Sequence, residues 1–388
     1  MDSDKASEFI HDLLRNMIER NGADLFISAG VPPSIKVDGI VNKLTDQPLS
    51  SNHTQMLVRS IMNDRQLAEF EDKKEINFAI AVPGLSRFRV NALVQKGSYA
   101  MVLRAIKNEI PLLSDIRVPP VLKDIAMSSR GLVILVGGTG SGKSTTLAAM
   151  IGYRNKNSQG HIITIEDPIE YVHEHNNCIV TQREIGIDTD SYEAALKNTL
   201  RQAPDVIMIG EVRDRETMEH AITFAETGHL CLATLHANTA NQAIDRIINF
   251  FPQERHQQLF MDLSLNLRSI VSQRLIRRID NIGRIPAVEV LTNSPLMSDL
   301  ILKGKITEMK ELVAKSTEMG MQTFDQALFS LYESGKIDYY EALRNADSVN
   351  DLRLKIKLKS KHSRDKSFLS GAEKIEMEEE VDSSGSLI

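Results

Sequence analysis

The sequence predicts an α/β fold, in which a parallel sheet covered by helices follows a smaller α+β domain and precedes a helical region. Three observations lead to this prediction. Short apolar runs alternate with helical patterns in the middle of the chain, a glycine-rich segment follows the first of these runs, and a group of prolines precedes it. Continuous apolar runs separated by helices are typical of strands that are covered on both faces.

The N-terminal part mixes helical and strand patterns. Apolar residues recur at helical spacing from about Ala6 to Arg20, and Asn21-Gly22 ends the pattern. Short strand-like runs follow, so that we predict an α+β domain over residues 1–110. The predicted strands are Asp24–Ser28, Ser34–Val37, Ile76–Val82 and Arg87–Leu93, with a helical run near Gln55–Phe70.

A linker is predicted at residues 111–120. Pro111, Pro119 and Pro120 interrupt the periodicity there, because proline fixes φ, lacks an amide donor and disfavours helix in the residue before it. A larger domain is predicted at 121–350. Its strands are Gly131–Val136, Ile162–Ile165, Val206–Ile209 and Leu230–Thr234.

Helical patterns are predicted from about Ala240 to Arg344. The segment Leu352–Lys359 alternates with period two, which is compatible with an edge strand or with a frayed terminus. Residues 351–388 form a predicted tail that is largely disordered, since its charge turns from basic to acidic. An apolar stripe, of a kind that is more often core than partner surface, comprises Leu259, Leu263, Leu267, Ile270 and Leu275.

The composition of the chain excludes several classes of protein. With 388 residues, 42% hydrophobic and 25% charged, the chain has the profile of a soluble globular protein with room for two domains. A net charge of −6 and few aromatic residues argue against nucleic acid as a partner. Cys178 and Cys231 stand far apart, which favours a reducing cytoplasm over a disulfide or thiolate site. We expect a protein that neither spans a membrane nor is exported.

The glycine-rich segment carries the most specific signal. It matches G-x-x-x-x-G-K-[ST] between an apolar strand and a helix that starts near Lys143. Its amides would surround phosphates, Lys143 would add a positive charge, and the Ser144 hydroxyl would ligate Mg²⁺, which predicts ATP as the ligand. The alternative is a strand-to-helix turn without a ligand. This phosphate loop comprises Gly137, Gly138, Thr139, Gly140, Ser141, Gly142, Lys143, Ser144 and Thr145.

Two carboxylates follow neighbouring predicted strands. Glu166 ends the strand at Ile162–Ile165, where a carboxylate can orient or deprotonate the attacking water. Glu211 follows Val206–Ile209 and is predicted to reach the metal through water, although Gly210 stands where an acid usually closes this strand. The alternative for Glu166 is an acidic turn at the end of a strand.

Histidines and arginines give weaker signals. His229 and His236 flank the fourth strand and are candidates for sensing the γ-phosphate, although such histidines are often structural. Alternation places Arg87 and Arg89 on one strand face. With Arg104 they are either a solvated face or arginine fingers that neutralise charge on the γ-phosphate.

Together these residues resemble the type IV pilus retraction ATPases, the PilT and PilU family of the secretion ATPase superfamily. The resemblance covers residues 24–358. Its most specific segments, among them those known in the family as the Walker A, Asp box, Walker B and His box motifs, are Arg87–Asn91, Gly137–Thr146, Thr164–Tyr171, Gly210–Asp214 and Gly228–Ala237.

The resemblance implies a PAS-like N-terminal domain joined to a RecA-like domain, assembled as a homo-hexameric ring with ATP between the two domains. It implies that Glu166 is the catalytic glutamate and Glu211 the Walker B acid. Arg87, Arg89 and Arg104 fall on the family's N-terminal arginine positions. Two isolated cysteines cannot form the four-cysteine zinc element of many extension and type II secretion ATPases, which favours retraction.

Residues 237–242 and 295–303 and the acidic tail resemble the PilU subgroup of accessory retraction ATPases. This resemblance implies a PilT-type companion ATPase, an inner-membrane pilus platform protein as partner, and a peripheral place at the cytoplasmic face of the inner membrane. Three alternatives stay open: a nucleotide-dependent scaffold with little turnover, a pilus-extension or type II secretion ATPase, and a nucleic-acid translocase.

Overall fold

The computed structural model describes residues 3–37, 39–106 and 109–361. Of the tail predicted at residues 351–388, residues 362–388 lie outside the described residues, whereas residues 351–359 are helical, so the tail begins later than predicted. By compactness the chain divides into two units, residues up to 112 together with 147–233, and residues 113–146 together with those from 234 onward. Each unit is described by itself.

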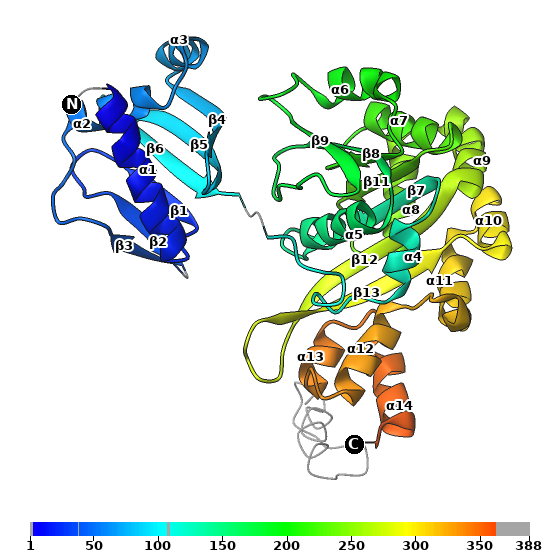
Figure 1. The fold of residues 1–388 in the computed structure, drawn as a ribbon. Coiled ribbons are helices and arrows are strands. Elements are labelled where there is room, and N and C mark those ends of the chain that lie inside the picture. The colour runs from blue at the N-terminus through cyan, green and yellow to red at the C-terminus, as the bar shows by residue number, and fades with distance from the viewer. Residues whose placement is uncertain (1–2, 38, 107–108, 362–388) are drawn as a thin grey trace, which may run out of the picture. The chain divides into compact units, whose positions relative to one another are not determined.

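The first unit contains a six-stranded antiparallel sheet with the order β3-β2-β1-β6-β5-β4. Its helix α1 lies along one face of this sheet (Figure 1). All four predicted strands of this region are confirmed. The elements are α1 (Ser3–Glu19), β1 (Asp24–Ile27), β2 (Ser34–Val37), β3 (Ile40–Lys43), α2 (Ser51–Ser60), α3 (Asp64–Lys73), β4 (Glu75–Val82), β5 (Ser86–Gln95) and β6 (Ser98–Ala105).

The helical run predicted near Gln55–Phe70 is two helices. Asn63 forms a capping box with Gln66 and so begins α3, which breaks the run. The core of the sheet is formed where the apolar stripe of α1, with Ile10 and Leu14 fully buried, packs against residues such as Phe88. Alternation then leaves the opposite face of β5 to polar side chains.

The first unit also holds four parallel strands of a second sheet, in the order β11-β10-β8-β9. The predicted strands are confirmed, and β9 was not predicted. The apolar runs are buried over most of their length, as the prediction of covered strands requires. The elements are β8 (Gly160–Glu166), β9 (Cys178–Glu184), α6 (Tyr192–Thr199), β10 (Val206–Ile209), α7 (Arg215–Glu226) and β11 (Leu230–Leu235).

The second unit contains the strands β13, β12 and β7, in that order. Strand β12 pairs in parallel with β7 and antiparallel with β13. The strands are β7 (Gly131–Val136), β12 (Leu267–Arg277) and β13 (Arg284–Thr292). The helices are α4 (Val121–Ala126), α5 (Lys143–Asn157, which continues into the first unit), α8 (Ala240–Phe250), α9 (His256–Asn266), α10 (Pro295–Leu302), α11 (Ile306–Lys315), α12 (Phe324–Glu333), α13 (Tyr339–Arg344) and α14 (Val349–Lys359). Short 3₁₀ turns lie at Leu200–Gln202, Gln253–Arg255 and Thr317–Met319.

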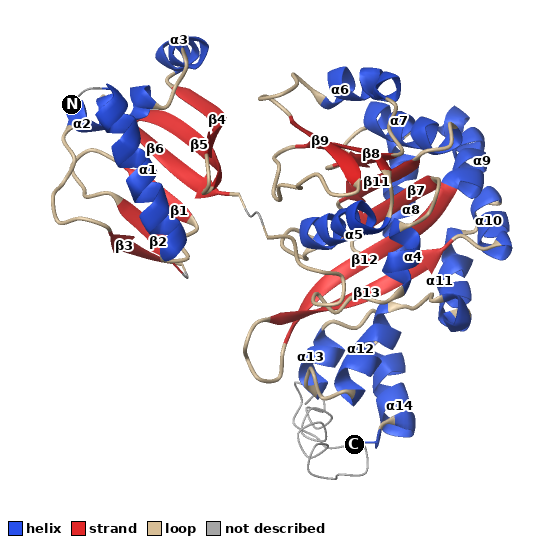
Figure 2. Ribbon diagram, in the orientation of Figure 1, coloured by secondary structure: helices blue, strands red, loops and turns tan. Residues whose placement is uncertain are grey.

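The prediction of an uninterrupted helical stripe through Leu275 is wrong. Helix α9 ends at Asn266, and the following residues form the long β12–β13 hairpin (Figure 2). Leu267 and Ile270 continue the helical spacing of Leu259 and Leu263, but they are buried in a strand that pairs with β7 and β13. Tertiary pairing therefore decided the structure of this segment.

The interpretation of Leu352–Lys359 as an edge strand is also wrong, because the segment lies in α14. Leu352 and Ile356, four residues apart, are buried against Phe324 and Leu328, while Leu354 faces solvent. A helix buries this pair on one face, which a strand cannot do without burying the intervening residues of the same parity.

Candidate active site

The phosphate loop follows β7, whose six residues are all buried, and α5 begins at Lys143 as predicted. Gly142 has a φ of +89°, which side chains rarely adopt. A Cβ added there would lie 2.7 Å from Nε2 of Gln273. Both the backbone conformation and the close approach of β12 therefore require glycine at this position.

The loop has the features that an oligophosphate requires. Nζ of Lys143 donates to the carbonyl oxygens of Gly137 and Gly138 at 2.7 and 3.0 Å, which holds a positive charge over the loop. The buried Oγ of Ser141 has no hydrogen-bond partner among the described residues. A Cβ added at Gly138 or Gly140 would meet no atom within 4 Å. Accessible backbone amides at the start of a helix, together with the ammonium group of Lys143, form a site that suits an anion.

Gln273 of β12 was not identified from the sequence, and it fixes the phosphate loop. Its Nε2 donates to the carbonyl oxygen of Ser141 at 2.9 Å, and its Oε1 accepts from Oγ1 of Thr146 at 2.8 Å. One buried side chain thus joins the loop to the first turn of α5. No sequence signal marked it, because it lies more than a hundred residues from the loop in a segment predicted to be helical.

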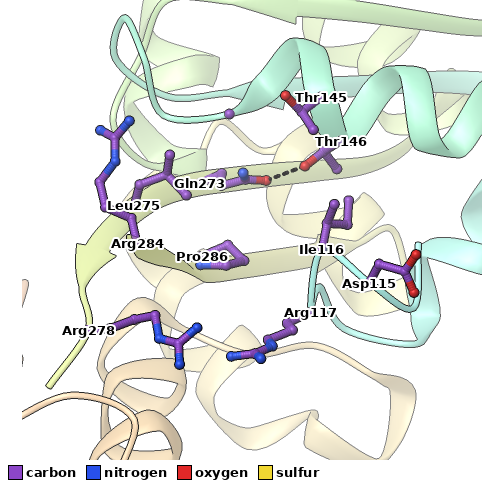
Figure 3. A pocket seen from close by; sticks show the side chains of 11 residues that line it. Asp115, Ile116, Arg117, Thr145, Thr146, Gln273, Leu275, Arg278, Arg284 and Pro286 are labelled. Carbon is purple, nitrogen blue, oxygen red and sulfur yellow. Dashed lines mark hydrogen bonds between the residues drawn. The ribbon is translucent and has the colours of Figure 1, made fainter. Parts of the chain in front are cut away.

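A cavity of about 300 Å³ lies beside the loop and is shown in Figure 3. Thr145 and Thr146 of α5 line one side of it, and Arg117 and Arg278 lie on the other side. Its remaining lining residues are Asp115, Ile116, Gly142, Gln273, Leu275, Arg284 and Pro286. Apolar surface combined with a few charged groups is typical of small-molecule sites.

Glu166 is the last residue of β8, and its side chain is buried. Its Oε1 accepts from Oγ1 of Thr164 at 2.7 Å and from Nε2 of Gln182 at 3.0 Å. Burial raises the pKa of Glu166 from 4.5 to about 7, although these two hydrogen bonds oppose the increase. A carboxylate with a pKa near neutrality is suited to accept a proton from water.

Glu211 lies just beyond β10 and is held by an arginine that the sequence analysis did not single out. Nε of Arg213 lies 2.5 Å from Oε2 of Glu211, and its NH1 lies 3.2 Å from Oδ2 of Asp167, next to Glu166. The guanidinium therefore bridges the ends of β10 and β8. The sequence offered one indication of this role, namely the predicted site residue Glu211 two positions before the arginine. Asp214 has a separate role, since it caps α7 by accepting from the amide of Thr217.

The two histidines lie at opposite ends of β11. His229 precedes the strand, and its Nδ1 lies 3.0 Å from Oγ1 of Thr227. His236 follows the strand, and β11, β10 and β8 are parallel, so that the end bearing His236 matches the ends bearing Glu166 and Glu211. Six strand residues span about 20 Å. The structure therefore does not bring His229 to the carboxylates of its own chain.

The three arginines lie on the face of the six-stranded sheet that is opposite α1. Arg89 is registered with Arg104 across β5 and β6, and Arg104 with Asp24 across β6 and β1. Nε of Arg104 lies 2.6 Å from Oδ1 of Asp24, a carboxylate that is 7% exposed. This ion pair fixes the position of Arg104, whose side chain is 69% exposed.

In the part of the chain that the structure describes, no three or more His, Cys, Asp or Glu side chains gather where they could hold a metal ion. Among the same residues, no helix has the length and apolarity needed to cross a membrane.

A buried strand, a glycine loop held at the start of a helix, and a buried carboxylate at a strand end define a phosphate-loop nucleotide hydrolase. The model of the type II/IV secretion system protein family matches residues 1–361. The chain is 62% identical to the type IV pilus ATPase PilU of Pseudomonas aeruginosa, over 91% of this chain and 92% of that protein. It is 42% identical to the retraction ATPase PilT of the same organism, over 87% of this chain and 98% of that protein.

A solved structure of the pilus retraction motor PilT with bound ADP matches with a TM-score of 0.82 at 39% identity, over 88% of this chain and 98% of that chain. The ATPase DotB of Legionella pneumophila matches with a TM-score of 0.75 at 28% identity, over 87% and 94%. The chain therefore belongs to the type II/IV secretion system protein family and, within it, to the type IV pilus ATPases PilT and PilU.

Proposed function

We propose that this chain couples ATP hydrolysis to the retraction of type IV pili, and so to twitching motility, as an accessory PilU-type motor that acts with a PilT-type companion. The observation that carries the enzymatic part is Glu166, a buried carboxylate with a pKa of about 7 at the end of a strand. The likeness to PilU and PilT supports the biological part.

The residues of the site would divide the work of hydrolysis. The phosphate loop and Lys143 bind the β- and γ-phosphates, and Glu166 takes a proton from the attacking water. The Ser144 hydroxyl and, through water, Glu211 would hold Mg²⁺, which neutralises charge on the triphosphate. Arg213 keeps the Glu211 carboxylate oriented.

The cavity beside the loop is the proposed place of the nucleoside. Ile116, Leu275 and Pro286 offer apolar surface for a base, and Arg278 and Arg284 offer donors to its polar edge, the ribose or the α-phosphate. Gln273, which lines the same cavity, would relate the position of the nucleoside to that of the phosphate loop.

The assembly is also a proposal: a homo-hexamer in which a PAS-like domain (residues 1–110) and a RecA-like domain with C-terminal helices (121–350) move about a linker at 111–120. Arg87, Arg89 and Arg104 would act as arginine fingers, and His236 as the γ-phosphate sensor. The position of the three arginines on the sheet face opposite α1 supports the first role. The second is supported by the place of His236 after β11, at the same end as Glu211 after β10. His229, at the far end of β11, would act toward a neighbouring subunit. The ring would act on an inner-membrane platform protein from the cytoplasmic face.

Replacing the proposed base tests the enzymatic assignment. Glu166→Gln should keep ATP binding and lower phosphate release by about a hundred- to ten-thousandfold, because the amide cannot accept the proton. Glu174→Gln, at an exposed position eight residues on, is the matched control. Unchanged turnover in Glu166→Gln would defeat the assignment.

Pilus retraction tests the biological role. Retraction should be measured for the wild type and Glu166→Gln, each with and without the companion ATPase. Retraction that needs the companion and falls with Glu166→Gln supports an accessory motor. Retraction that is equal in the wild type and Glu166→Gln favours a nucleotide-dependent scaffold with little turnover. A defect in pilus extension or type II secretion, in place of retraction, favours a pilus-extension or type II secretion ATPase.

A further inference from the structure

Gln182 of β9 reaches Glu166 because of the register between two strands. Strand β9 pairs in parallel with β8, and Gln182 is registered with Thr164. Thr164 and Glu166 are two residues apart in β8, so their side chains lie on the same face of the sheet. The long side chain of Gln182 extends diagonally to Glu166, and its Nε2 donates to Oε1 of Glu166 at 3.0 Å.

The amide group of Gln182 is fixed in one orientation by two backbone groups. Its Oε1 accepts from the amide of His173 at 2.7 Å, and its Nε2 donates to the carbonyl oxygen of Tyr171 at 2.9 Å. A backbone N–H only donates and a carbonyl oxygen only accepts, so turning the side-chain amide over would break both bonds. The remaining N–H of Nε2 is therefore held toward Glu166.

These contacts determine which oxygen of Glu166 is left for a proton. Oε1 accepts from Nε2 of Gln182 and from Oγ1 of Thr164, and a carboxylate oxygen has two lone pairs, so these two donors fill it. The Thr164 hydroxyl can rotate and accept, whereas the Gln182 amide cannot reverse. The backbone amide of Glu170 also acts on this carboxylate and occupies at most one further lone pair. Oε2 therefore keeps at least one lone pair for a proton.

We propose that Gln182 is a positioning residue of the hydrolytic site, which binds Oε1 of Glu166 so that Oε2 is the oxygen that takes the proton from the attacking water. The assignment rests on the proposed ATPase function. In this step an O–H bond of the water breaks and its proton goes to Oε2. The water oxygen bonds to the γ-phosphorus, and the bond from that phosphorus to the bridging oxygen of ADP breaks. Gln182 acts through Glu166 and not by contact with the phosphates.

A structural role is the alternative, because Gln182 also bonds the backbone of Tyr171 and His173 to β9. The pH dependence of turnover separates the two roles, since only a donor to Glu166 changes the pKa of that carboxylate. Burial lowers the pKa of His173 to about 4, so its imidazole stays neutral near pH 7. Charged groups at this strand end, which every variant below retains, include Glu170, Asp167, Glu184, Glu211 and Arg213.

Gln182→Met in the full chain removes the donor and keeps the length of the side chain at a half-buried position. A donor to an ionised carboxylate lowers its pKa, so its loss should move the acidic limb of kcat for ATP hydrolysis about one pH unit above its wild-type position near 7. At pH 7 this shift alone lowers kcat about fivefold. The KM for ATP should stay within about twofold of the wild type, because Gln182 does not bind the nucleotide.

Gln182→Lys should move the acidic limb in the opposite direction. Its ammonium group still donates to Glu166 and adds a positive charge, which favours the ionised carboxylate, so the limb should lie about one pH unit below that of the wild type. Loss of the bond to the His173 amide is common to both variants. A structural role therefore predicts similar changes in the two, and the positioning role predicts opposite shifts.

Thr181→Val is the matched control in the same strand. Thr181 is also half-buried, and its hydroxyl lies 2.9 Å from Nε2 of His161. Because neighbouring residues of a strand face opposite sides of the sheet, this change leaves the face that carries Glu166 intact. The acidic limb of Thr181→Val should coincide with that of the wild type.

Three results would overturn the assignment. An acidic limb that stays in place in both Gln182 variants, while Glu166→Gln lowers turnover as expected, would do so and leave the ATPase function standing. Limbs that move in the same direction in both variants, with lower unfolding temperatures of the nucleotide-free proteins, would identify a structural role. A wild type without turnover, or unchanged turnover in Glu166→Gln, would remove the proposed function and this inference with it.

Discussion

In the antiparallel sheet of the first unit, β5 buries alternate residues in the core, whereas β7, β10 and β11 of the second sheet are buried at every residue. The antiparallel sheet can therefore present Arg87 and Arg89 from within β5. The second sheet has no open face along these strands, and its chemistry lies at strand ends, at Glu166 and Glu211. The difference shows where functional side chains are expected. In the antiparallel sheet they lie on the face opposite α1, and in the second sheet they lie at or just beyond the last residue of a strand.

The largest expected effect comes from the loop after β7. Lys143→Ala should lower phosphate release by about a hundred- to a thousandfold, because the charge that holds the outer phosphates is lost. A phosphate-release assay checks this, with Lys156→Ala in the last turn of the same helix as control. Equal loss in both variants would show that net charge, and not the loop, determines the rate.

The middle of a buried strand should matter for stability alone. Ile207→Ala in β10 should lower the free energy of unfolding by about 2–5 kcal/mol, since it leaves a cavity in the core. Arg89→Ala, in the middle of β5 but on the open face, should change it by less than about 0.5 kcal/mol. Denaturant unfolding of both variants checks the comparison, and similar losses would break it.

Glu166 gives the expected pH dependence. Because only the ionised carboxylate accepts a proton, kcat should fall about tenfold per pH unit below an apparent pKa of about 7. Thr164→Val removes a hydrogen bond that lowers this pKa, so the acidic limb should move to higher pH by about one unit. Thr199→Val, which removes a buried hydroxyl bonded within α6, is the control. A limb that stays near 4.5 would show that Glu166 is not the base.

A small effect on stability is also expected near the end of β6, at Arg104. Arg104→Gln breaks an ion pair whose arginine is mostly exposed, so the free energy of unfolding should fall by no more than about 1 kcal/mol. Turnover of the assembled protein should fall more than stability does if Arg104 acts as an arginine finger. Thermal unfolding and turnover, measured on the same preparation, separate the two effects.

Much of the site could be predicted because it is local in the sequence. The strand, loop and helix around Gly137–Thr145 follow one another directly, and Glu166 and Glu211 each end a strand recognised by its apolar run. Gln273 and Arg213 could not be predicted in the same way. The first acts across more than a hundred residues, and the second joins two strand ends that are neighbours only in the sheet.

The sequence by itself determined the phosphate loop, the carboxylates and the alternation of β5, because glycine spacing, apolar runs and side-chain periodicity act over a few residues. Only the tertiary structure decided that the segment after Asn266 is a hairpin, that Leu352–Lys359 is helical, and that Gln273 bonds to the phosphate loop. Those outcomes depend on contacts with residues that are distant in the sequence. A local pattern does not show which residues these will be.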